Sequence, residues 1–113
     1  MKSLIATIKK VRDCLNEIEG AKFYHYRRPT NVKDRYGVWA EDGEQMPFNA
    51  GNKKAEQQIH GVIDYFTTVE YDSVVDEVQD ALENLGLASW MLSDVSYEDD
   101  TNLIHYLWEF YIG

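Results

Sequence analysis

The sequence predicts an α+β fold in which an antiparallel-dominated sheet carries two helices packed on one face. Two observations predict this class. Two stretches have helical periodicity and five have the β-branched and aromatic composition of strands, and they follow one another in the order α-β-β-β-α-β-β. At 113 residues the chain has the length of one domain, which we expect to span residues 1–113.

The first element is predicted to be an amphipathic helix. Its apolar residues lie four and three positions apart, at Leu4, Ile8, Val11, Leu15 and Ile18. That spacing places them on one helix face, and Gly20 is expected to end the helix. Cys14 flanks the apolar face and is expected to be a small core residue. As the lone cysteine it can form no internal disulfide, which favours a reducing cytoplasm.

Three strands are predicted next, at Lys22–Tyr26, Tyr36–Ala40 and Glu56–Thr68. The polar residues 27–35 between the first two are predicted to be a loop. A second, longer loop is predicted from Asp42 to Ala55, where Gly, Pro and Asn recur. Gly61 interrupts the third strand and is a candidate β-bulge.

The second helix is predicted to begin at Asp72 or Ser73, with Ser73 and Asp76 resembling a capping box. Its buried face comprises Val74, Val75, Val78, Ala81, Leu82 and Leu85. Gly86 ends it, and its exposed face is acidic, with Asp76, Glu77, Asp80 and Glu83. Two strands then close the chain, at residues 88–98 and 103–112. In the last strand a row of large residues is expected to pack on the helices: Ile104, Tyr106, Trp108, Phe110 and Ile112.

Charge is divided unevenly along the chain. Residues 1–54 hold all eleven Lys and Arg and seven acids, a net charge of +4, whereas residues 55–113 hold thirteen acids and no Lys or Arg, a net charge of −13. Two interpretations are open. Both halves can meet within one monomer and partly cancel, or the positive face of one copy can dock on the negative face of the next. Head-to-tail contacts of the second kind generate rings or filaments.

The acidic segment Glu41, Asp42 and Glu44 around Gly43 is the strongest candidate for a catalytic or metal site. Catalytic carboxylates need a pocket and partners from other elements, and Asp-Gly is itself a turn signal. The segment is therefore interpreted as the polar end of a strand that opens into a loop. There its carboxylates either stay solvated or meet Arg27, Arg28 or Lys53 of a neighbouring copy.

The three histidines lie in predicted strands, at His25, His60 and His105, and their spacing matches no zinc signature. They are interpreted as hydrogen-bonded sheet residues, although their convergence on a metal stays an open alternative. No nucleophile elbow, phosphate-binding loop or HExxH motif occurs, so the sequence predicts neither an enzyme nor a cofactor.

Binding of nucleic acid is a second alternative. The predicted loops would supply a basic patch from Arg27, Arg28, Lys33, Arg35, Lys53 and Lys54. The overall charge of −9 opposes it, because affinity for nucleic acid depends on neutralising phosphate. No apolar run reaches the roughly 20 residues that span a bilayer, and the N-terminus lacks the features of a signal peptide, so no membrane partner is expected.

The element order and four motifs resemble a family of small tail proteins from long-tailed phages and prophages of Gram-positive bacteria. The motifs are "YGVWAEDGE", "NKKAEQQIHGVIDYFT", "YDSVVDEVQDALENLG" and "NLIHYLWEF". The similarity runs from the first helix to the last strand and is to the tail-terminator, or tail-completion, group. In the last motif Asn102 stands where the family pattern has Gly.

The resemblance implies a structural role with no active site. Such proteins form a ring, typically a hexamer, on the end of the tail tube, contact the tube protein and the head–tail connector, and let DNA pass as cargo. It implies assembly in the host cytoplasm and residence at the head-proximal end of the virion tail. A head-completion or neck protein, or a small nucleic-acid- or peptide-binding module, is the alternative. The candidate interface residues are Met46, Pro47 and Phe48 on the long loop, the cations Arg27, Arg28, Lys53 and Lys54, and the acids Asp76, Asp80 and Glu83.

Overall fold

The computed structural model describes residues 3–45, 57–86 and 89–113. Within these ranges it contains two helices and a mixed five-stranded sheet. The elements are α1 (Leu4–Asn16), β1 (Lys22–His25), β2 (Arg35–Gln45), β3 (Gln58–Thr67), α2 (Val74–Asn84), β4 (Ser89–Glu98) and β5 (Leu103–Ile112). Their order is α-β-β-β-α-β-β, and the predicted fold class is confirmed.

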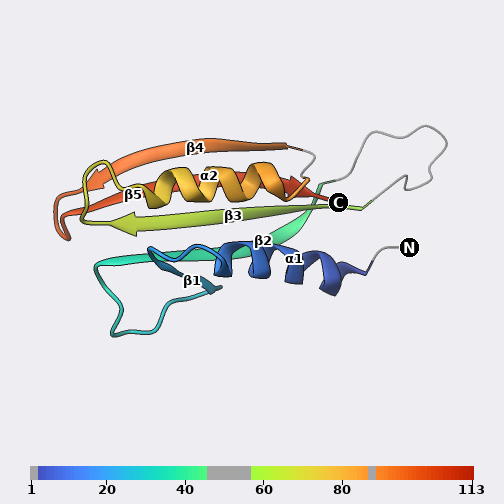
Figure 1. Cartoon of the computed structure of the whole chain (residues 1–113), viewed down its shortest axis with the longest axis horizontal. Helices are drawn as coiled ribbons and strands as arrows, with labels where there is room; N and C mark the ends of the chain where they lie inside the picture. The colour runs from blue at the N-terminus through green and yellow to red at the C-terminus, as the bar shows by residue number, and fades with distance from the viewer. Residues whose placement is uncertain (1–2, 46–56, 87–88) are drawn as a thin grey trace.

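The strands lie in the order β1-β2-β3-β5-β4. β1 runs parallel to β2, and the other three pairings are antiparallel. Both helices lie on one face of the sheet, with α1 over the β1–β2 side and α2 over β3 and β5 (Figure 1). The core fills the space between these layers and is dominated by Val11, Leu15, Ile63, Tyr65, Val78, Leu82, Trp108 and Phe110.

The predicted helices and strands differ from the observed ones mainly at their ends. Ser3 is the N-cap of α1, and its side-chain oxygen accepts a hydrogen bond from the Ala6 N–H at 3.1 Å. The helix ends at Asn16, so the predicted stop at Gly20 is wrong. Ile18, the last residue of the predicted apolar row, lies in the connection to β1 and is buried from there rather than from the helix.

β2 is longer than predicted. It continues through residues 41–45, so the first part of the predicted Asp42–Ala55 loop is wrong. Pairing with β3 holds this polar segment extended, with Glu41 opposite Gly61 and Gly43 opposite His60. Asp42 is the extra residue between these pairs, which makes it a β-bulge.

Gly61 does lie at a bulge, as predicted, but the extra residue belongs to β2 rather than to β3. Gly61 is the glycine that lets Phe110 of β5 lie flat on the sheet, since a Cβ built on Gly61 would fall 2.3 Å from the Phe110 ring. Gly37 does the same for Phe23 of β1, with a distance of 2.1 Å. Both glycines therefore serve the packing of a neighbouring aromatic side chain.

The last strand follows its prediction. Trp108, Phe110 and Ile112 are buried on the helix side, while Ile104 and Tyr106 of the same row are half-buried. In the turn before β5, Asn102 has a φ of 60°, in the left-handed region that Gly favours and Asn tolerates. The Asn at this position therefore preserves the turn geometry.

A buried carboxylate connects α2 to the sheet. Asp72 has a fully buried side chain and accepts hydrogen bonds from Arg35 Nε (3.0 Å) and Nη2 (2.6 Å), the hydroxyls of Tyr65 (2.6 Å) and Thr67 (2.7 Å), and the Val74 N–H (2.9 Å). Burial alone would raise its pKa, but the bonds from Arg35 and Tyr65 outweigh burial and hold that pKa well below its usual range.

The same carboxylate replaces the predicted capping box. Ser73 occupies the N-cap position of α2, but its side chain makes no capping hydrogen bond. Asp72 satisfies the free N–H of Val74 instead, so the prediction for Asp72 is confirmed and that for the Ser73 box is wrong.

We predict that Asp72→Asn lowers the free energy of unfolding by about 3 kcal/mol, because it removes the charge that pairs with the Arg35 guanidinium and puts an N–H donor in place of one of the two accepting oxygens. Urea unfolding at pH 7 measures the loss. Asp76→Asn, on the exposed face of the same helix, is the matched control and should change stability by less than about 0.5 kcal/mol. Equal stability of the two variants would contradict the role given to Asp72.

Gly61→Ala should destabilise the fold by about 1–3 kcal/mol, because the new methyl group overlaps the Phe110 ring. Adding Phe110→Leu to Gly61→Ala should recover part of this loss, since the smaller side chain makes room. Thermal unfolding of the two single variants and the double variant gives the coupling between the positions. Strictly additive losses would show that the two residues do not compete for space.

Candidate assembly surface

The order of the strands keeps the two halves of the sequence apart. α1, β1 and β2 form one side of the molecule, and β3, β5, β4 and α2 form the other (Figure 1). The second side, residues 57–113, holds twelve Asp and Glu and no Lys or Arg. Between described residues, the Arg35–Asp72 ion pair is the one Lys/Arg–carboxylate bridge that joins the sides. The described part of the first side, residues 3–45, holds eight Lys and Arg and seven Asp and Glu, a net charge of +1, so the described charge is divided laterally between a nearly balanced side and a strongly acidic one.

The sheet ends in β1 on the first side and β4 on the second. Among the described residues, neither strand has a partner on its outer edge. β1 has four residues and β4 has ten. Exposed strand edges offer unpaired backbone groups to another chain, so the two edges are the natural places for association.

The basic loop beside β1 positions its two candidate arginines differently. Arg27 is exposed. Arg28 donates from Nη1 to the Val32 carbonyl at 2.8 Å, and its guanidinium lies 5.1 Å from the centre of the Tyr36 ring. Arg28 therefore shapes the loop, whereas Arg27 is presented to solvent.

The other candidate interface residues fall into two groups. Asp76, Asp80 and Glu83 are exposed on α2, as predicted. The remaining candidates lie outside the described residues: Met46, Pro47, Phe48, Lys53 and Lys54. Their predicted contact with a neighbouring subunit or the tube stays a prediction.

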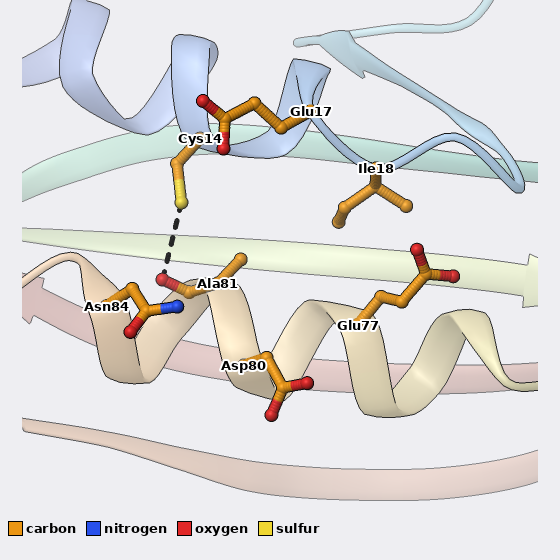
Figure 2. A pocket seen from close by; sticks show the side chains of 7 residues that line it. All are labelled: Cys14, Glu17, Ile18, Glu77, Asp80, Ala81 and Asn84. Carbon is orange, nitrogen blue, oxygen red and sulfur yellow. Dashed lines mark hydrogen bonds between the residues drawn. The ribbon is translucent and has the colours of Figure 1, made fainter.

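A shallow groove of about 220 Å³ separates the two helices (Figure 2). Glu17, Glu77 and Asp80 surround it, and Cys14 lies on the α1 wall with its Sγ donating to the Ala81 carbonyl at 3.3 Å. Burial, with a contribution from Glu17, raises the pKa of the Cys14 thiol. The thiolate is thus disfavoured, in agreement with the prediction that Cys14 is a small packing residue rather than a nucleophile.

The acidic segment after Ala40 has partners within its own chain. Glu41 Oε2 lies 2.7 Å from His25 Nε2, and its other oxygen accepts from the Tyr26 hydroxyl. The His25 ring is stacked between Tyr26 and Trp39, with centroid distances of 3.7 and 3.8 Å. Burial alone would raise the pKa of Glu41, but the hydrogen bonds from Tyr26 and His25 lower it.

Asp42, the bulged residue, contacts His60 on the face of the sheet that has no helices. The second ring nitrogen of His60 lies 3.0 Å from Glu109 Oε1, and Ser93 Oγ donates to the other Glu109 oxygen. Ser93 is the extra residue of a second bulge, in β4. Asp42, His60, Glu109 and Ser93 thus form one polar row across β2, β3, β5 and β4. Asp42 and Ser93 are the bulged residues, and His60 and Glu109 occupy regular strand positions.

His105 is satisfied separately, by Asp64 at 2.6 Å, and its ring is stacked on Phe66 with a centroid distance of 4.3 Å. Each of the three histidines therefore has a carboxylate partner from this chain, as expected of sheet histidines, and they do not converge. Within the described ranges no three His, Cys, Asp or Glu side chains form a group that could hold a metal ion. Glu41 and Asp42 thus each have a histidine partner within the chain, and their expected contact with Arg27, Arg28 or Lys53 of a neighbouring copy stays a prediction.

Sequence reasoning did not predict these histidine–carboxylate pairs. The register between β2 and β3 brings Asp42 to His60, and the register between β3 and β5 brings His60 to Glu109. The alternation of polar residues places these side chains on one face of each strand. Only the strand order and register show which of them lie next to one another.

No helix in the described part of the chain is long and apolar enough to cross a membrane. No protein-family model matches the sequence, and neither does any of the curated proteins compared with it.

We predict that His60 titrates above its ordinary value of 6.5. Burial would lower its pKa, but hydrogen bonds to Asp42 and Glu109 raise it overall. Protonated His60 therefore stabilises the fold fully below about pH 6.5, and this contribution is lost as pH rises through the folded-state pKa. An NMR titration of the imidazole measures the midpoint directly.

Glu109→Gln is the test of the cause, because it removes one of the two negative charges while keeping the shape. It should lower the His60 midpoint and weaken the stability advantage at pH 5.5 relative to pH 8.5. A wild-type midpoint at or below 6.5 would contradict the assignment.

Proposed function

We propose that this chain is a structural subunit of a virus tail, a tail terminator that assembles head to tail into a ring at the end of the tail tube and joins tail to head. The observation that carries the proposal is the lateral division of charge, with an open strand edge on each side. A contact between unlike edges is heterologous, and heterologous contacts close into rings when the rotation between subunits permits.

The chemistry of the described side chains agrees with a structural role. The perturbed carboxylates Glu41, Asp72 and Glu109 each owe their shifted pKa to groups that also hold strands or helices together. None of them lines the groove between the helices. The acidic second side would repel passing DNA if it lined the ring, and would so let DNA slide through.

A head-completion or neck protein would use the same kind of ring, so the test must identify the partner. Tail tubes assembled from the tube protein of the same genome provide it. Added in small amounts, the chain should stop tube elongation and appear as a cap at one tube end in electron micrographs. An unrelated acidic protein of similar size is the control.

Other outcomes of that experiment are equally informative. Tubes that lengthen as usual while the chain binds emptied heads would assign it to the head side of the joint. Normal elongation with no binding to either structure would overturn the proposal. Salt-sensitive retardation of nucleic acid in a gel would then favour the nucleic-acid module.

The charge contact gives a further measurement. Light scattering after size exclusion should show a closed oligomer at low salt that loosens as salt increases, because exposed charge pairs are screened beyond about 8–10 Å at physiological ionic strength. An oligomer whose mass is independent of salt would mean that charge does not guide the contact.

A further inference from the structure

β4 is an edge strand with an uncovered apolar face. On the helix side of the sheet Leu92, Val95 and Tyr97 are 40, 49 and 59% exposed. α2 lies over β3 and β5 and not over the β4 ribbon (Figure 1). Solitary exposed apolar residues are ordinary, but three on one face of one edge strand indicate a contact surface.

The opposite edge has the direction needed to pair with it. β1 is parallel to β2, and the next three pairings are antiparallel, so β1 and β4 run in opposite directions. If one sheet continued into the next copy, β4 of the first and β1 of the second would form an antiparallel pair. The registers place Tyr24 of β1 and Asp94 of β4 at the same level of the sheet.

The helix layer would continue in the same way. Cys14 and Glu17 of α1 face α2 across the groove (Figure 2). At 100° per residue, Ile5 and Arg12 lie on the opposite flank of α1. Ile5 is 58% exposed, and Arg12 is exposed beside it.

The Ile5–Arg12 flank of α1 is complementary to the exposed surface of β4 and α2 in two respects, one apolar and one electrostatic. Ile5 of the second copy would meet the apolar face of β4. Arg12 of the second copy, which pairs with Asp13 of its own chain, would approach Asp76 and Glu83 on the solvent-facing crest of α2. Lys22 of β1 would likewise lie near Asp94 on the open face of the sheet.

We propose that β4 of one copy pairs with the outer edge of β1 of the next, and that α1 of that second copy covers Leu92, Val95 and Tyr97. The occupant of the apolar face is thus a second copy of this chain. The inference rests on the proposed head-to-tail assembly and names the surfaces that form it.

A matched pair of double variants tests the apolar contact. Val95→Ser with Tyr97→Ser removes it, whereas Val69→Ser with Tyr71→Ser makes the same changes at the same spacing in the β3–α2 turn, where the two residues are 42 and 91% exposed. The first double variant should weaken self-association by roughly tenfold or more, and the second should leave it unchanged. Circular dichroism melts establish that both remain folded. Equal association by the two variants overturns the proposal.

Cross-linking tests the pairing of unlike edges. In a Cys14→Ser background, one chain carries Tyr24→Cys and another carries Asp94→Cys, and a short bis-maleimide tolerates a small shift along the strands. Cross-linked dimers should form in the mixture of the two chains and not in either chain alone. A mixture of Tyr24→Cys and Tyr71→Cys chains is the control and should give no dimer.

The remaining results separate this inference from the proposed function. Cross-linking of the Asp94→Cys chain with itself would show a two-fold β4–β4 contact and overturn the inference. An oligomer that caps tail tubes but gives no 24–94 product would also overturn it while the tail role survives. A 24–94 product from a chain that ignores tail tubes would support the contact and remove the tail role.

Discussion

The buried carboxylate of Asp72 is the interaction on which the arrangement of this fold depends. It gathers donors from β2, from β3 and from the first turn of α2, so three elements share one acceptor. A buried charge costs several kcal/mol when it is unpaired, and this penalty makes its partners obligatory. Arg35 supplies the counter-charge from the cation-bearing half of the sequence. The same bond therefore fixes where α2 begins and how the two halves of the chain meet.

Local sequence patterns determine much of this structure. The spacing of Val11 and Leu15, and that of Val78 and Leu82, predicts both helices, and the alternation around Trp108 and Phe110 predicts the buried face of the last strand. These patterns suffice because each element buries its apolar residues against the same core. The strand order, by contrast, depends on long-range pairing, and no local pattern predicts the parallel β1–β2 pair.

The errors at β2 have the same origin. Glu41 and Asp42 have low intrinsic preference for strands, and Gly43 follows them, so the local sequence predicts a loop. β3 overrides that preference by pairing with the segment, and His25 and His60 bind the two carboxylates. The packing role of Gly61 is not visible in local sequence either, because the space it leaves is filled by Phe110, forty-nine residues later. Such a contact becomes visible only once β3 and β5 are known to be neighbours.

These internal pairings decide which parts of the molecule stay available to a partner. The histidines and their carboxylates hydrogen-bond to one another on the sheet. The unpaired backbone groups that another chain could bind lie at the edge strands β1 and β4. β4 has neither Lys nor Pro, the residues that commonly protect an edge strand, and its charges, Asp94 and Glu98, are both negative. Two β4 edges would repel one another, whereas a β4 edge and a β1 edge attract. A β4 edge that repels another β4 edge and attracts a β1 edge favours head-to-tail association over a two-fold dimer. A head-to-tail series that closes on itself is a ring.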